Sequence, residues 1–149
     1  MNIVIDFATE ADLPVLADLL TELFTLEADF KPDREKQLRG LKMILDNPAI
    51  GRLFALRVNG KVAGMANALI TVSTAQGAPV LLLEDVIVSQ RHRGKDLGRR
   101  LVEHVCGWAK GQGMARVTLL ADRDNAPALA FYDKLGFAPS AMVVRRKVL

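Results

Sequence analysis

The spacing of apolar positions changes along the chain, from a helical period to a strand-like one. Leucines and other apolar residues recur every three to four positions over 11–28, and a second apolar stripe follows over 33–45, which predicts two amphipathic helices. Before them, residues 1–7 alternate between apolar and polar side chains as in a short strand. The first third of the chain therefore predicts one strand followed by two helices.

The middle of the chain has the pattern of a sheet. Residues 52–58 and 61–74 are rich in apolar side chains and flank Asn59–Gly60, a pair typical of a tight hairpin turn. The next strand, 80–88, is apolar almost throughout, which is typical of a strand covered on both faces. The elements that follow alternate: a helix over 96–110, a strand over 115–121, a helix over 126–135 and a last strand over 141–148.

This order of elements, β-α-α-β-β-β-α-β-α-β, predicts a single α/β domain over residues 1–149 with a mixed sheet. A length of 149 residues and a hydrophobic share of 50% suit one globular core and argue against disorder. The only cysteine, Cys106, cannot form an internal disulfide. Acidic residues are frequent in the first 30 positions and no apolar run approaches the roughly 20 residues of a bilayer span, so we expect a cytoplasmic protein and no membrane partner.

Charge and composition argue against two further classes of partner. The formal net charge is only +3, the basic residues gather in one turn rather than along a stripe, and aromatic residues make up 5% of the chain, so we expect no nucleic acid partner. His92, His104 and Cys106 are too few and too poorly spaced for a metal site, so we expect no metal.

The first segment with chemical character is 88–101, where an apolar strand leads through a basic, glycine-containing turn straight into a helix. Such a junction points several backbone N–H groups and the positive end of the helix dipole at one place, which favours an anion such as a pyrophosphate. Arg93, Lys95 and Arg99 add positive charge, and the glycines allow close approach. The alternative is a solvated basic turn that only begins a helix.

The second segment is 125–137. Asn125 stands at the expected N-cap of a helix and Pro127 in its first turn. Tyr132, the only tyrosine, follows Asn125 by seven residues, about two turns, and so shares its face of the helix. The alternative is that Phe131 and Tyr132 simply anchor a short helix in the core.

Taken together, the two segments resemble motifs of the GNAT superfamily of acyl-CoA-dependent N-acyltransferases. Residues 88–101 are similar to its pyrophosphate-binding motif, R-G-x-G-x-G after a strand that ends in Val, and 125–137 to its motif N-x-x-A-x-x-F-Y-x-x-x-G-F. The sharp similarity is confined to 80–137. The resemblance implies a largely antiparallel central sheet flanked by helices, and an N-acetyltransferase that uses acetyl-CoA.

The resemblance also implies where acetyl-CoA lies. The cofactor would occupy a V-shaped gap beside strand 80–88, with backbone groups of Val86 and Val88 paired to the pantetheine arm and Ile87 facing the other way. Asn125 would bond the CoA arm or hold its loop. The expected cofactor-binding residues are Val86, Ile87, Val88, Arg93, Gly94, Lys95, Asp96, Leu97, Gly98, Arg99 and Asn125.

Asp96 departs from the family motif, because it stands where the middle glycine is usual. A carboxylate beside a pyrophosphate is repulsive. As the N-cap of helix 96–110 it would instead accept backbone N–H bonds, and we expect its side chain to turn away from the ligand in this way. The affinity for CoA is the property that this residue puts in question.

An acceptor amine is mostly protonated at pH 7, so a base must remove a proton before or during attack. Glu84 and Asp85 are the candidates, and because successive strand side chains face opposite ways, we expect only one of them to face the cleft. We choose Glu84 as the base, with Asp85 as the alternative or as the ligand of the substrate ammonium. A buried ion pair with an arginine is the structural alternative. By the resemblance, Tyr132 would protonate the departing thiolate.

The acceptor itself is not fixed by any motif. In the family it is shaped by the region corresponding to 11–50, where Glu22, Glu27 and Asp29 could attract a cationic amine, although such charges are more often a solvated helix face. The stretch 83–85 is similar to family members that act on polyamines or amino sugars. We expect a small-molecule primary amine of polyamine, amino sugar or amino acid type. The alternatives are a protein N-terminus or lysine, and a catalytically silent CoA-binding regulatory module; a homodimer is left open.

Overall fold

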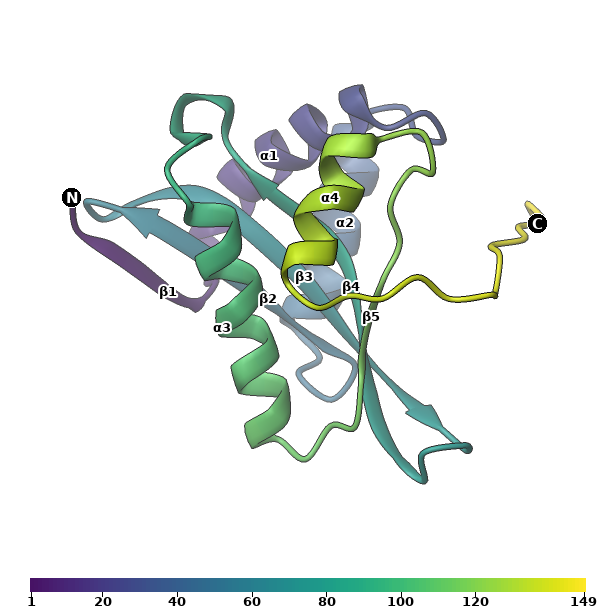
Figure 1. The fold of residues 1–149 in the computed structure, drawn as a ribbon. Helices are drawn as coiled ribbons and strands as arrows, with labels where there is room; N and C mark the ends of the chain where they lie inside the picture. Colours follow the sequence, from purple (N-terminus) through teal and green to yellow (C-terminus); the bar gives the residue numbers. More distant parts are fainter.

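The computed structural model describes residues 1–149 and contains a five-stranded sheet with helices on both faces (Figure 1). The strands lie in chain order, and neighbours are antiparallel except for the parallel last pair, β4 and β5. The elements are β1 (Ile3–Phe7), the 3-10 turn η1 (Glu10–Asp12), α1 (Leu13–Leu26), α2 (Arg34–Leu45), β2 (Gly51–Val58), β3 (Lys61–Ser73), β4 (Ala78–Val88), the 3-10 turn η2 (Gln90–His92), α3 (Leu97–Gly111), β5 (Val117–Leu119) and α4 (Ala126–Lys134).

Two apolar layers hold the helices on the sheet. Because strand side chains alternate between faces, each strand supplies both layers. Leu16 and Leu41, from α1 and α2, pack with Met65 of β3 on one face, whereas Leu101 of α3 packs with Leu81 of β4 on the other. Figure 1 shows α1 and α2 behind the sheet and α3 and α4 in front of it. The expected fold class, a mixed and largely antiparallel sheet flanked by helices, is confirmed.

Local signals begin and end the elements largely as the sequence predicts. The turn between β2 and β3 has positive φ at both Asn59 (51°) and Gly60 (83°), the conformation that this pair favours in two-residue hairpins. The side chain of Asn125 accepts a hydrogen bond from the N–H of Ala128 at 3.2 Å, so it is the N-cap of α4 as expected. None of the helices is both long enough and apolar enough to span a membrane.

The C-terminal segment differs from the expectation. The strand predicted over 141–148 does not form, and residues after α4 have no regular secondary structure (Figure 1). Its neighbour would be β5, which has only three paired residues and therefore offers a short ladder for hydrogen bonding. The segment is held instead by an ion pair between Arg146 and Asp29 at 2.7 Å. Its apolar pattern predicts a strand, but the pairing edge is too short.

Candidate functional site

The two parallel strands of the sheet separate part-way along. β4 pairs with β5 only over residues 81–83, opposite 117–119. Beyond Leu83, β4 continues to Val88 while the chain after β5 turns away (Figure 1). The last four residues of β4, 85–88, therefore pair with β3 on one edge and have no strand on the other. This is the gap expected beside strand 80–88.

The open edge of β4 presents backbone hydrogen-bonding groups. The N–H of Ser89 donates to the carbonyl of Ala63 beside β3 at 2.8 Å. Backbone groups point alternately to the two edges of an antiparallel strand, so those of Val86 and Val88 point into the gap. The side chain of Ile87 packs in the layer under α1 and α2, on the face opposite to Val86 and Val88. An extended ligand would find here the pairing edge of a strand.

A β-bulge in β4 lies at Glu84. Asn67 of β3 pairs with Asp85 and the next residue, Ala68, pairs with Leu83, so Glu84 has no residue opposite it. Glu84 and Asp85 both line a groove that β5 and α4 also line. The expectation that only one of them faces this cleft is wrong, because the extra residue of the bulge breaks the alternation of side chains.

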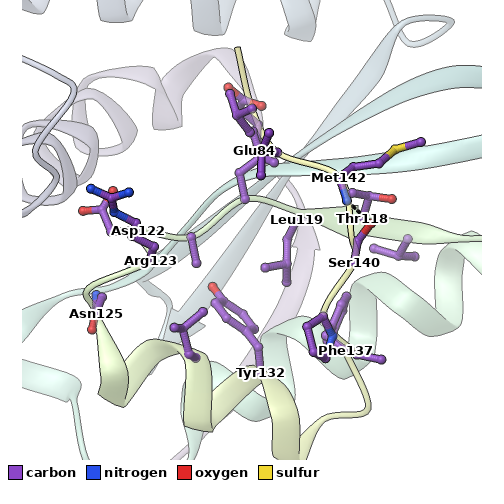
Figure 2. Close-up of a pocket in the computed structure, with 18 of the residues that line it drawn as sticks. Glu84, Thr118, Leu119, Asp122, Arg123, Asn125, Tyr132, Phe137, Ser140 and Met142 are labelled. Carbon is purple, nitrogen blue, oxygen red and sulfur yellow. Dashed lines mark hydrogen bonds between the residues drawn. The ribbon is translucent and has the colours of Figure 1, made fainter. Parts of the chain in front are cut away.

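The groove has a volume of about 2010 Å³ and is bounded by segments far apart in the sequence. The connection between α1 and α2, the strands β4 and β5, the helix α4 and the C-terminal segment all line it. Figure 2 shows Tyr132 pointing from α4 into the groove, with Glu84 across it and Asp122 and Asn125 toward one end. Acidic and phenolic groups from β4, the loop after β5 and α4 thus face one open space.

Asp85 is the buried carboxylate of the site. It is 9% exposed, and Nδ2 of Asn67 donates to its Oδ2 at 3.0 Å. Burial raises the pKa of Asp85 to about 6, against the opposing effect of the Asn67 hydrogen bond. Glu84, by contrast, is exposed. Asp85 is therefore the buried carboxylate of the bulge, and its pKa is raised toward neutrality.

Glu27 adds a third carboxylate to the groove. It follows the last residue of α1 and is half-buried. Burial first, and then the negative charges of Asp85 and Asp122, raise the pKa of Glu27 to about 7. Asp122, in the loop after β5, is held against this region by a hydrogen bond from the N–H of Ala28 at 3.4 Å. The groove therefore concentrates negative charge near Asp85.

Tyr132 both packs in the core and presents its hydroxyl to the groove, so it has the features of a packing residue and of a site residue. Its ring packs edge-on against Phe131 and Phe137, with ring centroids 5.1 and 5.9 Å apart. Its hydroxyl faces the groove (Figure 2). Burial, together with the nearby charge of Glu27, raises the pKa of Tyr132, so the hydroxyl keeps its proton at neutral pH. The ring is a core residue and the hydroxyl belongs to the groove.

The basic turn before α3 is partly neutralised by acids. Arg93 donates from Nε to the carbonyl of Val88 and from Nη2 to Glu22, each at 3.0 Å. Gly94 has a φ of 79°, in the left-handed region that glycine adopts without strain. Lys95 is exposed, and the side chain of Leu97 is buried in the core, which leaves only its backbone to face a ligand.

Gly98 has a packing role as well. It is the second residue of α3, and a Cβ added there would lie 3.4 Å from the ring of Phe131 on α4. That distance is tight for a side-chain contact. The glycine thus allows α4 to approach the first turn of α3 closely, whereas the sequence motif had suggested only the approach of a ligand.

Asp96 does not cap α3 through its side chain, so that expectation is wrong. Its φ of 65° is left-handed, whereas a capping side chain is usually carried by an extended residue. The carboxylate turns to Arg99 instead and accepts a hydrogen bond from Nε at 2.9 Å. Arg99 also donates to Glu103 at 3.0 Å. The expected phosphate ligand Arg99 is therefore bound to two carboxylates of its own helix region.

Comparison with known proteins decides the family. A family model described as the acetyltransferase (GNAT) family matches residues 13–137, which includes both motifs and the open edge of β4. The chain belongs to the GNAT acetyltransferase family. Among its relatives is the uncharacterized N-acetyltransferase YobR of Bacillus subtilis, 29% identical over 120 residues, which are 80% of this chain and 45% of YobR.

Two further GNAT comparisons extend this result. Streptothricin acetyltransferase of Streptomyces lavendulae is 36% identical over 84 residues, 56% of this chain and 42% of that protein. The chain thus spans less than half the length of both relatives. The structure of AAC(6')-Iy in complex with the bisubstrate analog CoA-S-monomethyl-acetylneamine has a TM-score of 0.82 at 20% identity, covering 100% of this chain and 99% of that one. It has the same fold.

Glu27 and Asp122, which line the groove, and Asn67, which contacts Asp85, differ in how far the sequence of this GNAT chain marks them. Glu27 and Asp122 each stand among other acids, so nothing distinguishes them from solvated surface charges. Asn67 does carry a signal: it is a lone amide between small and apolar residues of a strand that is buried over much of its length. A polar side chain in such a place needs a hydrogen-bond partner, and the partner is Asp85.

Proposed function

We propose that residues 1–149 act as one N-acetyltransferase domain that moves an acetyl group from acetyl-CoA directly to a primary amine of a small molecule. The observation that carries the proposal is the gap beside β4, where an open backbone edge adjoins buried Asp85 and the hydroxyl of Tyr132. Membership of the GNAT family supports acetyl transfer, and the CoA-derived analogue bound to AAC(6')-Iy supports acetyl-CoA as the donor.

The donor would lie along the open edge. Backbone groups of Val86 and Val88 pair with the amides of the pantetheine arm, as a neighbouring strand would. The pyrophosphate meets the turn 93–99 and the N-terminus of α3, where free N–H groups and the helix dipole favour an anion. Asn125 shapes the start of α4 beside this path. The positive φ of Gly94 suits a turn that brings backbone close to a ligand.

The acceptor amine must lose a proton to attack the thioester carbonyl. A free alkylammonium has a pKa near that of lysine, about 10.4, so the neutral amine is scarce at pH 7. The sequence alone favours Glu84 as base, but the burial of Asp85 makes it the better proton acceptor at neutral pH. Glu84 and Glu27 then attract the ammonium into the groove.

Transfer is then one displacement at the acetyl carbon. The amine nitrogen forms a bond to the carbonyl carbon, and the N–H of Val86 or Val88 donates to the oxygen on which negative charge develops. As the carbon–sulfur bond breaks, the nitrogen, which is cationic after attack, loses its second proton to solvent, and Tyr132 donates its phenolic proton to the thiolate of CoA. Solvent then takes the first proton from Asp85 and returns one to Tyr132, so one proton is released overall. Because the amine attacks the thioester directly, no group of the enzyme is acylated.

The direct test is release of free CoA thiol from acetyl-CoA in the presence of a panel of primary amines. The proposal expects thiol release that depends on the amine, together with an acetylated amine in equal amount. Tight binding of CoA with no thiol release would instead favour a silent CoA-binding regulatory module. Release of CoA thiol only in the presence of a peptide N-terminus or a lysine side chain would mean that the acceptor is a protein.

Asp96→Gly is expected to bind CoA more tightly, by about 3-fold to 30-fold, because a negative charge at the pyrophosphate turn is removed. Glycine also adopts the left-handed φ of this position without strain, and Arg99 loses one of its two carboxylate partners. Titration calorimetry with CoA at low and high salt measures the effect, which should shrink as salt rises.

The control for this substitution is Glu103→Gln, which frees Arg99 from its other acid without altering the turn. A small gain in CoA affinity in Glu103→Gln and a large gain in Asp96→Gly would support repulsion between Asp96 and the pyrophosphate. Weaker binding by the glycine variant would mean that the carboxylate of Asp96 organises the turn.

A further inference from the structure

A second cavity, of about 280 Å³, lies between α1, α2 and the sheet. Its walls are largely apolar, and two polar side chains of adjacent strands, Asn67 and Asp85, line it from the sheet. The volume lies just below the usual range for ligand pockets, which starts at about 300 Å³, and well above the roughly 150 Å³ that admits benzene. The apolar lining residues are Leu20, Phe24, Phe30, Leu41 and Ile44.

Asn67 has an unsatisfied hydrogen-bonding atom in this cavity wall. The residue is 6% exposed, and its Nδ2 is used in the bond to Asp85, but its Oδ1 is buried without a partner. Native proteins keep few such atoms, because an unpaired buried acceptor is destabilising. A ligand that brings an N–H group to Oδ1 would satisfy it.

The cavity and the groove adjoin. Asp85 and Phe30 line both spaces. A molecule held between α1 and α2 can therefore place an amine beside Asp85, next to the gap in which the thioester is proposed to lie. Its body would remain on the α1 and α2 side of the sheet, away from α3 and α4.

The residues at the mouth of the cavity disfavour certain chemical groups on the part of the acceptor that lies away from its reacting amine. Lys31 and Lys36 are exposed at the mouth, whereas the carboxylate of Asp33 accepts a hydrogen bond from the N–H of Lys36 at 3.2 Å as the cap of α2. A second ammonium group would lie near two lysines. Sugar hydroxyls would lose water against the apolar walls without gaining enough partners.

We propose that this cavity holds the body of the acceptor and selects primary monoamines with a compact alkyl or aryl body over polyamines and amino sugars. The amine nitrogen donates one N–H to Oδ1 of Asn67 and another to Asp85, which takes a proton from the amine; the neutral amine then rotates about its C–N bond to direct its lone pair at the thioester. This inference rests on the proposed acetyl transfer and narrows its acceptor class.

Gly40 offers a way to close the cavity without disturbing the fold. It lies in α2 and lines the cavity, and a Cβ added there meets nothing within 4 Å. Leucine is also a better helix former than glycine, so Gly40→Leu should fill the space and keep or raise stability. Gly107→Leu is the matched control, because Gly107 lies in α3, is exposed and also has nothing within 4 Å.

The experiment compares kcat/KM for 2-phenylethylamine, pentylamine, spermidine and glucosamine at saturating acetyl-CoA. The values of kcat/KM for 2-phenylethylamine and pentylamine should exceed those for spermidine and glucosamine by about 10-fold or more. Gly40→Leu should lower kcat/KM for 2-phenylethylamine by about 10-fold to 100-fold, with the KM for acetyl-CoA unchanged. Gly107→Leu should match the wild type.

Two results would overturn the acceptor pocket while leaving acetyl transfer intact: equal or better use of spermidine or glucosamine, or wild-type kinetics in Gly40→Leu. If no amine is acetylated, calorimetric titration of 2-phenylethylamine separates the two proposals. Binding to the wild type that is lost in Gly40→Leu would support the pocket and reject the transferase, whereas no binding to either protein would reject the pocket.

Discussion

Replacing Asp85 with asparagine is expected to lower kcat/KM at pH 7 by about 10²-fold to 10⁴-fold, the range for loss of a general base. The wild-type rate should rise with pH through about 6, where Asp85 loses its proton, and the variant should lack that limb. Its activity should recover at high pH, where the amine is already neutral. A pH profile of kcat/KM from 5 to 10 measures both effects.

The matched control is Glu84→Gln, which alters the adjacent, exposed carboxylate of the bulge. It should lose much less activity and keep the limb near pH 6. The opposite outcome, with the large loss in Glu84→Gln and a mild one in Asp85→Asn, would return the role of base to Glu84.

The same Asp85 substitution should stabilise the fold at neutral pH. The pKa of Asp85 is raised from 3.8 to about 6 in the folded protein, so folding favours the protonated form. The native state is therefore not penalised below about pH 4, where both states are protonated; the penalty grows as the pH rises between the two pKa values and is complete above about 6. A shift of about two units corresponds to about 3 kcal/mol. Urea unfolding should show Asp85→Asn more stable than the wild type at pH 8 and equal to it at pH 4.

Tyr132→Phe is expected to lower kcat by about 10-fold to 10³-fold while the KM for acetyl-CoA changes little, because the hydroxyl acts on the departing sulfur. The ring contacts with Phe131 and Phe137 are retained in the variant, so its melting temperature should stay close to that of the wild type. Steady-state kinetics and a thermal melt suffice to separate the two roles of the side chain.

Phe137→Leu is the complementary variant, since it removes a ring contact of Tyr132 and leaves the hydroxyl in place. It should lower the melting temperature more than it lowers kcat. An unchanged kcat in Tyr132→Phe would mean that this tyrosine is only a packing residue of α4.

The features that could be predicted from the sequence are those fixed by neighbouring residues. The hairpin turn at Asn59–Gly60 and the cap at Asn125 depend on a few adjacent positions, and both are present. The apolar run of β4 likewise predicts a strand covered on both faces, and β4 lies between β3 and β5 with helices on each side.

The features that could not be predicted depend on partners distant in the chain. The bulge at Glu84 arises from the register of β3 against β4, which no local pattern specifies, and it decides that Asp85 and Glu84 line the same groove. The bond between Asp96 and Arg99 is local, by contrast, but the residue type favours an equally local cap of α3, and only the left-handed φ of Asp96 decides between the two. The apolar pattern of the C-terminal segment predicts a strand. The sequence does not predict that β5, the strand it would pair with, has only three residues.

The position of the sheet between its two helical layers bears on which properties of the protein can be altered separately. Gly40 and Asp96 belong to opposite layers, α2 on one face and the start of α3 on the other. Substitutions that share no partners usually have additive free energies. In a cycle of Gly40→Leu, Asp96→Gly and the double variant, the change in amine preference and the change in CoA affinity should therefore each be the same in either background. Acceptor choice and donor affinity could then be engineered, or drift in evolution, independently.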